Sequence, residues 1–349
     1  MAQDQSVLNL PGTAVQGSVS DRSLPVRWAH GSWSFIVGRP IGAVGLFLIV
    51  ITIGAAVFAP LVSRYDPDKT FTTANPAFRE DLYEQSLDNP LMRSTPPYSE
   101  HPEWFAKGEQ PNQLASPSSK HWLGTDNHAH DMWARIIYGA QLSLLVGIGG
   151  AVIAVFFGTV LGVVSGYFGG WVDMVIQRIS DAMYTFPPLI LLLLFVQVID
   201  RPNKYHITIA LGLVGIAQVI RIVRASVLSA REDVYVSAAR TIGASDSRIM
   251  LRHIFPNITA PIIVVFTISI GLYILAEAGL AFIGLGDPAA ISWGKMVNDG
   301  RNFGSTEPYM ALFSGLAITF TVLGFNLFGD ALRDALDPRL RGRGSRTGF

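Results

Sequence analysis

The sequence predicts an all-α membrane protein that crosses the bilayer six times. Half of its 349 residues are apolar and only 15% are charged, whereas a water-soluble domain carries about a quarter charged residues. A hydrocarbon core about 30 Å thick needs about 20 apolar residues per helix. Six stretches without Lys, Arg, Asp or Glu meet or approach that length, at residues 40–63, 136–172, 182–199, 205–220, 253–276 and 308–329.

The stretches differ in what they imply about each span. The first begins too late and runs too long for a signal peptide, so we interpret 39–63 as an uncleaved first span after a polar and interfacial segment, 1–38. The second is long enough for one span with interfacial turns at both ends. Two prolines at 187–188 should distort the third helix near its inner end. The fourth is short, but Arg221 and Arg224 can snorkel and lengthen it.

A long insert separates the first two spans, at residues 64–135. It holds eight prolines, which argue against long helices, and scattered aromatic residues, which argue against a plain linker. We therefore expect a small irregular subdomain there. The five remaining spans form a core at 136–330, followed by a tail at 331–349.

The charged residues predict the orientation in the membrane. With the N-terminus inside, the inner segments hold 15 arginines, whereas the two short outer loops hold two arginines and two lysines. The positive-inside rule then places both termini in the cytoplasm and the insert on the outer side of the membrane. The net charge of zero indicates no nucleic-acid partner, and the absence of cysteine excludes disulfides and Cys metal sites.

The longest inner loop, about 232–256, has the pattern of two short helices joined by a turn. Apolar residues fall at helical spacing in the first helix, at Tyr235, Ala238, Ala239 and Ile242. Gly243 suits the position directly after a helix, which often has a left-handed backbone conformation. A compact helix–turn–helix of this kind fits a groove on a partner protein. A solvated basic loop explains the same spacing equally well.

The second helix of this loop also carries signals of its own. Ser245 can cap it, Asp246 is favourable in its first turn, and Pro256 is tolerated where the next span begins. The candidate coupling residues of the whole loop are Tyr235, Ser237, Ala238, Ala239, Arg240, Gly243, Ala244, Asp246, Arg248 and Pro256.

This loop resembles the signature of the permeases of binding-protein-dependent ABC importers. That signature reads Glu-Ala-Ala, three residues, Gly, nine residues, then Ile-x-Leu-Pro. Residues 238–239, Gly243 and Pro256 match it at the right spacing. The chain departs from it at Ser237, His253 and Phe255, which stand where the family has Glu, Ile and Leu.

Further segments resemble the second, C-type permease of dipeptide, oligopeptide and nickel importers. They lie at 58–67, 123–126, 135–140, 166–170, 285–286, 293–294 and 326–330. The similarity covers about residues 38 to 341 apart from the insert. The chain has Ala129-His130 where that branch has Gly-Arg.

The resemblance implies a type I ABC importer permease that moves di- and oligopeptides and is not itself an enzyme. It implies a homologous permease partner, two cytoplasmic ATP-binding subunits and an exterior solute-binding protein. ATP and magnesium would bind to the ATPase subunits, so no cofactor is expected on this chain. A permease for nickel or another small solute is the nearest alternative.

Two other classes fit the residues less well. An ion-coupled secondary transporter predicts charged residues at the membrane midplane, and Glu277 alone lies in a span, off centre. A membrane enzyme needs clustered His, Asp or Glu, and Asp173, Arg178 and Asp181 are too sparse. We interpret these four residues and Asp330 as structural or gating residues.

Other polar residues have plainer explanations. Gln197, Gln218 and Asn326 lie within spans, where helix–helix hydrogen bonding is the favoured role. Three histidines, at 121, 128 and 130, lie near Asp126 and Asp131, a spacing that can bind a transition metal. We favour solvated side chains and predict no metal site. No substrate-contacting residue is predicted.

Overall fold

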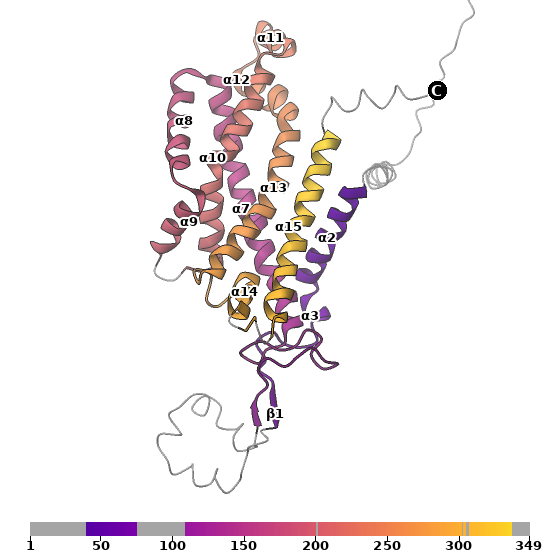
Figure 1. Ribbon diagram of the computed structural model, residues 1–349. Coiled ribbons are helices and arrows are strands. Elements are labelled where there is room, and N and C mark those ends of the chain that lie inside the picture. Colours follow the sequence, from indigo (N-terminus) through magenta and orange to yellow (C-terminus); the bar gives the residue numbers. More distant parts are fainter. Residues whose placement is uncertain (1–39, 75–108, 200–201, 302, 305–306, 337–349) are drawn as a thin grey trace, which may run out of the picture.

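The computed structural model describes residues 40–74, 109–199, 202–301, 303–304 and 307–336. The predicted segment 1–38, the insert residues 75–108 and the tail from 337 onward lie outside these ranges. Within them, the chain is a bundle of long helices (Figure 1). The bundle has a loop end, which carries the 232–256 segment, and an insert end, which carries residues 64–74 and 109–131.

Within the described ranges, five helices are long and apolar enough to cross a membrane. They are α2 (Pro40–Val57), α7 (Met132–Phe168), α10 (Lys204–Arg231), the helix Asp246–Phe282 that contains α13 (Phe255–Phe282), and α15 (Tyr309–Leu336). A bent pair, α8 (Gly170–Thr185) and α9 (Pro188–Gln197), makes a sixth crossing if counted as one span. The predicted all-α fold of the six-span type is confirmed.

The third span is broken rather than merely distorted. Its two helices meet at 88°, and the break contains Phe186 and Pro187. The proline rings stop the i to i−4 hydrogen-bond ladder, so α8 cannot continue into α9. The span also begins earlier than expected, because Gly169 and Gly170 take positive φ values of 67° and 54° and turn the chain directly from α7 into α8.

Several boundaries differ from the predicted ones. The first span divides at Phe58, where α3 (Ala59–Val62) follows with Pro60 in its first turn. Helix α7 begins at Met132, four residues before the predicted core, because the side chain of Asp131 accepts a hydrogen bond from the Ala134 N–H at 2.9 Å. Helix α15 runs past 330 to Leu336, since neither Gly nor Pro interrupts it there.

Three small elements complete the insert end. Strands β1 (Thr72–Ala74) and β2 (Glu109–Pro111) pair antiparallel, which places both sides of the insert next to each other. The short helix α14 (Trp293–Arg301) was not predicted. The Trp293 indole donates to the Ile136 carbonyl of α7 at 2.9 Å, which fixes α14 against the bundle.

Glycines allow α7 and α10 to approach closely. Gly158, Gly162 and Gly166 recur every fourth residue on α7, and they face Val219, Val223 and Val227 of α10. A methyl group added at these glycines would lie 2.5, 2.8 and 2.8 Å from the Cβ atom of the facing valine. Small residues of this kind let membrane helices pack backbone to backbone, so this glycine ladder holds the two central helices together.

Candidate functional site

A helix–turn–helix stands beyond the bundle at the loop end (Figure 1). Its first helix, α11 (Val234–Thr241), is followed by Gly243 with a φ of +80°, which side chains other than glycine rarely adopt. The Gly243 N–H donates to the Arg240 carbonyl at 3.0 Å, and the Ala244 N–H donates to the Ala239 carbonyl at 3.1 Å. These bonds close the predicted turn. We call residues 234–249, from α11 through α12 (Asp246–Ile249), the knob.

The knob has one buried face and one exposed apolar face. Val236, Ala239 and Ile249 are buried and attach it to the bundle. On the outer side, Val234 and Ile242 are 84% and 85% exposed. Two large aliphatic side chains at such exposure form an apolar surface without a cover in the described part of the chain.

The predicted apolar stripe does not coincide with the buried face. Of Tyr235, Ala238, Ala239 and Ile242, Ala239 alone is buried, because α11 faces the bundle through positions 236 and 239. Ser237, Arg240 and Arg248 are exposed as well. The hydroxyl of Tyr235 accepts a hydrogen bond from the Asn257 amide at 3.0 Å, which ties α11 to the start of α13.

The second half of the loop is continuous with the next span. Ser245 occupies the N-cap position of α12, but its side chain makes no capping bond. A π-helical turn, η1 (Met250–Ile254), then joins α12 to α13. Pro256 therefore lies inside a continuous helix, not at the start of a span. The wider π turn accommodates the proline ring, which would otherwise clash with the carbonyl of residue 252.

Tyr167, near the end of α7, joins the knob to the bundle. The Tyr167 hydroxyl donates to the Asp246 carboxylate at 2.5 Å. The Arg240 guanidinium lies 5.9 Å from the centroid of the Tyr167 ring. Tyr167 is buried, so it couples both knob helices to the bundle core.

Ionic contacts hold three helices together just inside the knob. Arg224 of α10 makes a bidentate ion pair with Asp173 of α8, with both N–O distances at 2.6 Å. The same carboxylate accepts a hydrogen bond from the Ser165 hydroxyl of α7 at 2.5 Å. Arg231 donates to the Gly166 and Tyr167 carbonyls, both at 3.2 Å. The loop end is thus a continuous polar network under the knob.

The other predicted structural residues lie apart from this network. Asp181 pairs with Arg221 at 2.7 Å, whereas Arg178 lies 4.0 Å from Asp181 and is largely exposed. Asp330 is exposed on α15. The structure therefore does not gather the predicted acidic and basic residues into one site.

Glu277 is buried near the insert end of α13 and is 1% exposed. Its Oε1 atom accepts a hydrogen bond from the Ser292 hydroxyl at 2.8 Å, and Oε2 has no partner among the described residues. The segment that leads into α14 contributes to this burial through Ser292, which the sequence did not predict. The contact joins α13 to the chain segment that leads into α14.

The histidines at the insert end belong to a hydrogen-bonded cluster. His121 contacts Asp131 at 2.8 Å, and His130 contacts Asp126 at 3.2 Å. Asp126, His128 and His130 bring their ligand atoms within 4.8 Å of one another, a grouping that can hold a metal ion. However, an Arg135 nitrogen lies 2.7 Å from His130 Nδ1 and 3.5 Å from the Asp126 carboxylate, where it supplies positive charge itself.

The pKa of Asp126 follows from these neighbours. Burial disfavours the charged carboxylate, but the hydrogen bond from His130 and the positive charge of Arg135 outweigh it and hold the pKa of Asp126 below its ordinary value of 3.8. The carboxylate also accepts the backbone N–H groups of His128 and His130, both at 2.8 Å. Asp126 therefore organises this turn as an anion.

Sequence reasoning missed Tyr167, Arg224 and Val236 as residues that position the knob. Tyr167 lies in the 166–170 segment that resembles the family, but its partner Asp246 is 79 residues away. The sequence predicts that the Arg224 side chain snorkels, whereas in the structure it forms the bidentate ion pair with Asp173.

The chain matches the family model for the binding-protein-dependent transport system inner membrane component over residues 158–342. It is 44% identical over 238 residues to the dipeptide transport system permease protein DppC of Alkalihalophilus pseudofirmus, covering 68% of this chain and 78% of the relative. It is 35% identical to the oligopeptide transport system permease protein OppC of Bacillus subtilis, over 93% of each chain. It is 40% identical to the glutathione transport system permease protein GsiD of Pectobacterium atrosepticum, over 64% of this chain and 75% of the relative. A chain with this helical bundle and these matches belongs to the family of binding-protein-dependent transport system inner membrane components.

Proposed function

We propose that this chain is the permease subunit of an ABC importer that carries di- and oligopeptides across the inner membrane. Family membership makes the chain a membrane transport component and not an enzyme. The relatives described above are named for dipeptide, oligopeptide and glutathione transport, which supports a peptide cargo over nickel. The family match argues against an ion-coupled secondary transporter.

The proposed complex contains a homologous permease chain, two cytoplasmic ATP-binding subunits and an exterior solute-binding protein. ATP and magnesium bind to the ATPase subunits. Both termini lie in the cytoplasm, as the imbalance of 15 inner arginines against four outer cations favours. The insert then lies on the periplasmic side and the knob on the cytoplasmic side.

The observation that carries the coupling role is the exposed apolar face of the knob. Val234 and Ile242 present aliphatic side chains beyond the bundle, on a helix fixed by a glycine turn. An amphipathic helix lying in a groove of a partner is a common recognition mode. Behind this face, the Tyr167–Asp246 hydrogen bond and the continuous helix from α12 to α13 connect the knob to the spans. A movement of the ATPase subunits thus reaches the bundle as a rigid-body shift.

A matched pair of variants tests the docking face. Ile242→Asp places a charge on the exposed apolar surface, whereas Ile242→Val keeps it apolar. We expect Ile242→Asp to reduce co-purification of the ATPase subunits and peptide-stimulated ATP hydrolysis by tenfold or more, and Ile242→Val to leave both nearly unchanged. Full ATPase recovery with Ile242→Asp would exclude the knob as the docking element.

The orientation is tested with single cysteines, because the chain has none of its own. Ser116 and Ser245 are both exposed, at the insert end and in the knob. In intact cells, Ser116→Cys should react with an impermeant thiol reagent and Ser245→Cys should not. The reverse labelling pattern would overturn the proposed orientation.

The cargo is tested by growth. Cells that lack this chain should fail to use short peptides as an amino-acid source, while nickel uptake stays unchanged. Loss of nickel-dependent enzyme activity with intact peptide growth would overturn the peptide assignment.

A further inference from the structure

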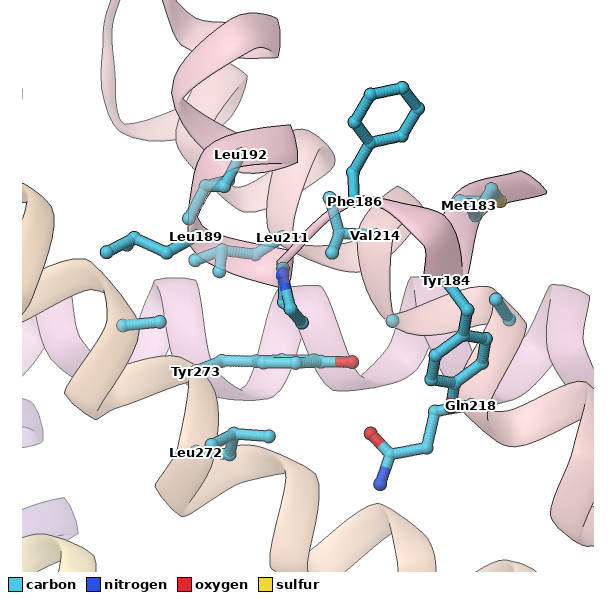
Figure 2. A pocket seen from close by; sticks show the side chains of 14 residues that line it. Met183, Tyr184, Phe186, Leu189, Leu192, Leu211, Val214, Gln218, Leu272 and Tyr273 are labelled. Atoms are coloured by element: carbon cyan, nitrogen blue, oxygen red, sulfur yellow. The ribbon is translucent and has the colours of Figure 1, made fainter. Parts of the chain in front are cut away.

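A cavity of about 280 Å³ lies at the break between α8 and α9, where α10 and α13 complete its wall. Figure 2 shows the Tyr273 ring lying across it, with its hydroxyl directed toward the side that holds Tyr184 and Gln218. Phe186, Leu189 and Leu272 supply much of the apolar wall. The break in the third span creates this space, because α9 leaves the path that a continuous helix would fill.

The cavity lies at the middle of the membrane-spanning bundle. Gln218 is 14 residues from the start of α10 and 13 from its end, which places it about 20 Å from either end of the helix. A cargo that crosses the bilayer must pass this depth. The site is therefore far from the knob and from the insert.

Gln218 is a polar residue of the cavity wall that makes no hydrogen bond within the described part of the bundle. Its side chain is exposed, and its amide has no hydrogen-bond partner among the described residues, contrary to the helix–helix role expected for it. The hydroxyl of Tyr184, on the same wall, likewise has no hydrogen-bond partner in the described part of the chain. Polar groups facing hydrocarbon without partners are costly, so this wall does not suit lipid.

The chemistry of the wall suits a neutral peptide segment. None of its 14 lining residues is charged or a histidine, so it offers no ligand set for a metal cation. The carboxamide of glutamine both donates and accepts, as does every peptide unit of a cargo, whatever its side chains are. The volume is slightly below the range of about 300–1,000 Å³ for ligand pockets, which fits one side chain but not a whole oligopeptide.

We propose that this cavity receives one apolar side chain of a peptide in transit, while Gln218 hydrogen-bonds the adjacent peptide unit. The inference rests on the proposed peptide-import function. The neutral amide of Gln218 recognises the peptide backbone, and the apolar cavity accepts side chains of different shapes. Together they retain cargo of varied sequence without binding it tightly. A helix of the partner permease and a lipid chain are the competing occupants.

Site-directed disulfide trapping in the reconstituted complete complex tests the proposal. Gln218→Cys gives this chain a single thiol, and Phe156→Cys is the matched control, since Phe156 is 62% exposed on α7 and lies outside the cavity lining. The probe is a short peptide that carries a cysteine activated as its pyridyl disulfide. We expect at least tenfold more labelling at Gln218→Cys than at Phe156→Cys, and loss of that labelling with excess unmodified peptide.

Three results would overturn the proposal. Equal labelling at both positions, insensitive to competing peptide, would show a lipid-facing wall. Labelling of Gln218→Cys in the isolated chain but not in the complex would show that the partner permease fills the cavity. Labelling at neither position in a complex that takes up peptide would place the path elsewhere. Peptide uptake by the wild-type complex is measured in the same vesicles, and its absence would instead refute the proposed function.

A second measurement separates recognition from folding. Gln218→Met keeps the length of the side chain but removes the amide, so the complex should still assemble. We expect the peptide concentration for half-maximal uptake to rise about fivefold or more. Unchanged uptake by an assembled Gln218→Met complex would exclude the amide from the path.

Discussion

The glycine ladder between α7 and α10 predicts that a single methyl group destabilises the bundle. In Gly162→Ala, the added Cβ atom would lie 2.8 Å from the Val223 Cβ and 3.0 Å from the Ile220 carbonyl oxygen. Carbon atoms in contact are normally about 3.5–4.0 Å apart, so α7 and α10 must separate by roughly 1 Å. Val223 is fully buried.

The magnitude follows from two opposing effects. Overpacking a close-packed site costs about 1–3 kcal/mol, whereas replacing glycine by alanine in a helix gains about 0.5–1 kcal/mol. We therefore expect a net loss of about 1–2 kcal/mol in the free energy of unfolding for Gly162→Ala. Gly54→Ala and Gly315→Ala are matched controls, since neither added methyl group would have an atom within 4 Å, and they should be neutral or stabilising.

Thermal unfolding of the purified protein in detergent measures the difference. At about 2–4 °C per kcal/mol, Gly162→Ala should lower the melting temperature by about 2–8 °C relative to the controls. Gly158→Ala, with its shorter approach of 2.5 Å to Val219, should lower it further. If both ladder variants melt together with Gly54→Ala, the ladder does not hold these helices and the reasoning is refuted.

Three further predictions concern single polar contacts. Because the pKa of Asp126 in the folded chain lies below its ordinary value of 3.8, the carboxylate stabilises the insert end above pH 3.8, and this contribution is lost as the pH falls through the folded value. Asp126→Asn should therefore flatten the decrease in melting temperature below pH 3.8, and an unchanged slope would contradict this expectation. Glu277→Gln keeps an acceptor for Ser292 and should lower the free energy of unfolding by less than about 1 kcal/mol, whereas Glu277→Leu should lower it by about 1–3 kcal/mol. Equal melting temperatures for the two variants would argue against the buried contact. Tyr167→Phe removes a hydrogen bond to the exposed Asp246 carboxylate that is worth about 1 kcal/mol. Hydrogen exchange of the knob amides should therefore speed up about fivefold, while exchange in α10 stays unchanged. Exchange of the knob amides at the wild-type rate would mean that Tyr167 does not anchor the knob.

The positions of the spans could be predicted because hydrocarbon imposes a length and a composition on every crossing. The turn at Gly243 was predictable for a similar local reason, since its φ of +80° is one that glycine favours. The distortion by the prolines at 187–188 also follows from local chain chemistry. The 88° angle between α8 and α9 could not be predicted in this way, because it depends on the space that α10 and α13 leave for α9.

Contacts between distant residues could not be read in the same way. Asp173 has several arginines within reach by sequence, and the packing of α8 on α10 selects Arg224. The apolar residues of the knob illustrate a second limit. Helical spacing identifies Ile242 as part of a stripe, but an outward-facing docking surface and an inward-facing core give the same spacing. Glu277 is a third case, because Ser292, in the segment that leads into the unpredicted helix α14, contributes to its burial.

The unbroken helix from Asp246 to Phe282 has a mechanical consequence. Its 37 residues, which include the π turn and Pro261, extend about 55 Å along the helix axis from the knob to the insert end. A tilt of about 5° at one end moves the other by roughly 5 Å, which is comparable to one helical turn. The Glu277–Ser292 bond sits near the far tip, where the displacement is greatest. If this helix moves as a rigid body, a small rotation of the knob becomes a large movement at the other end.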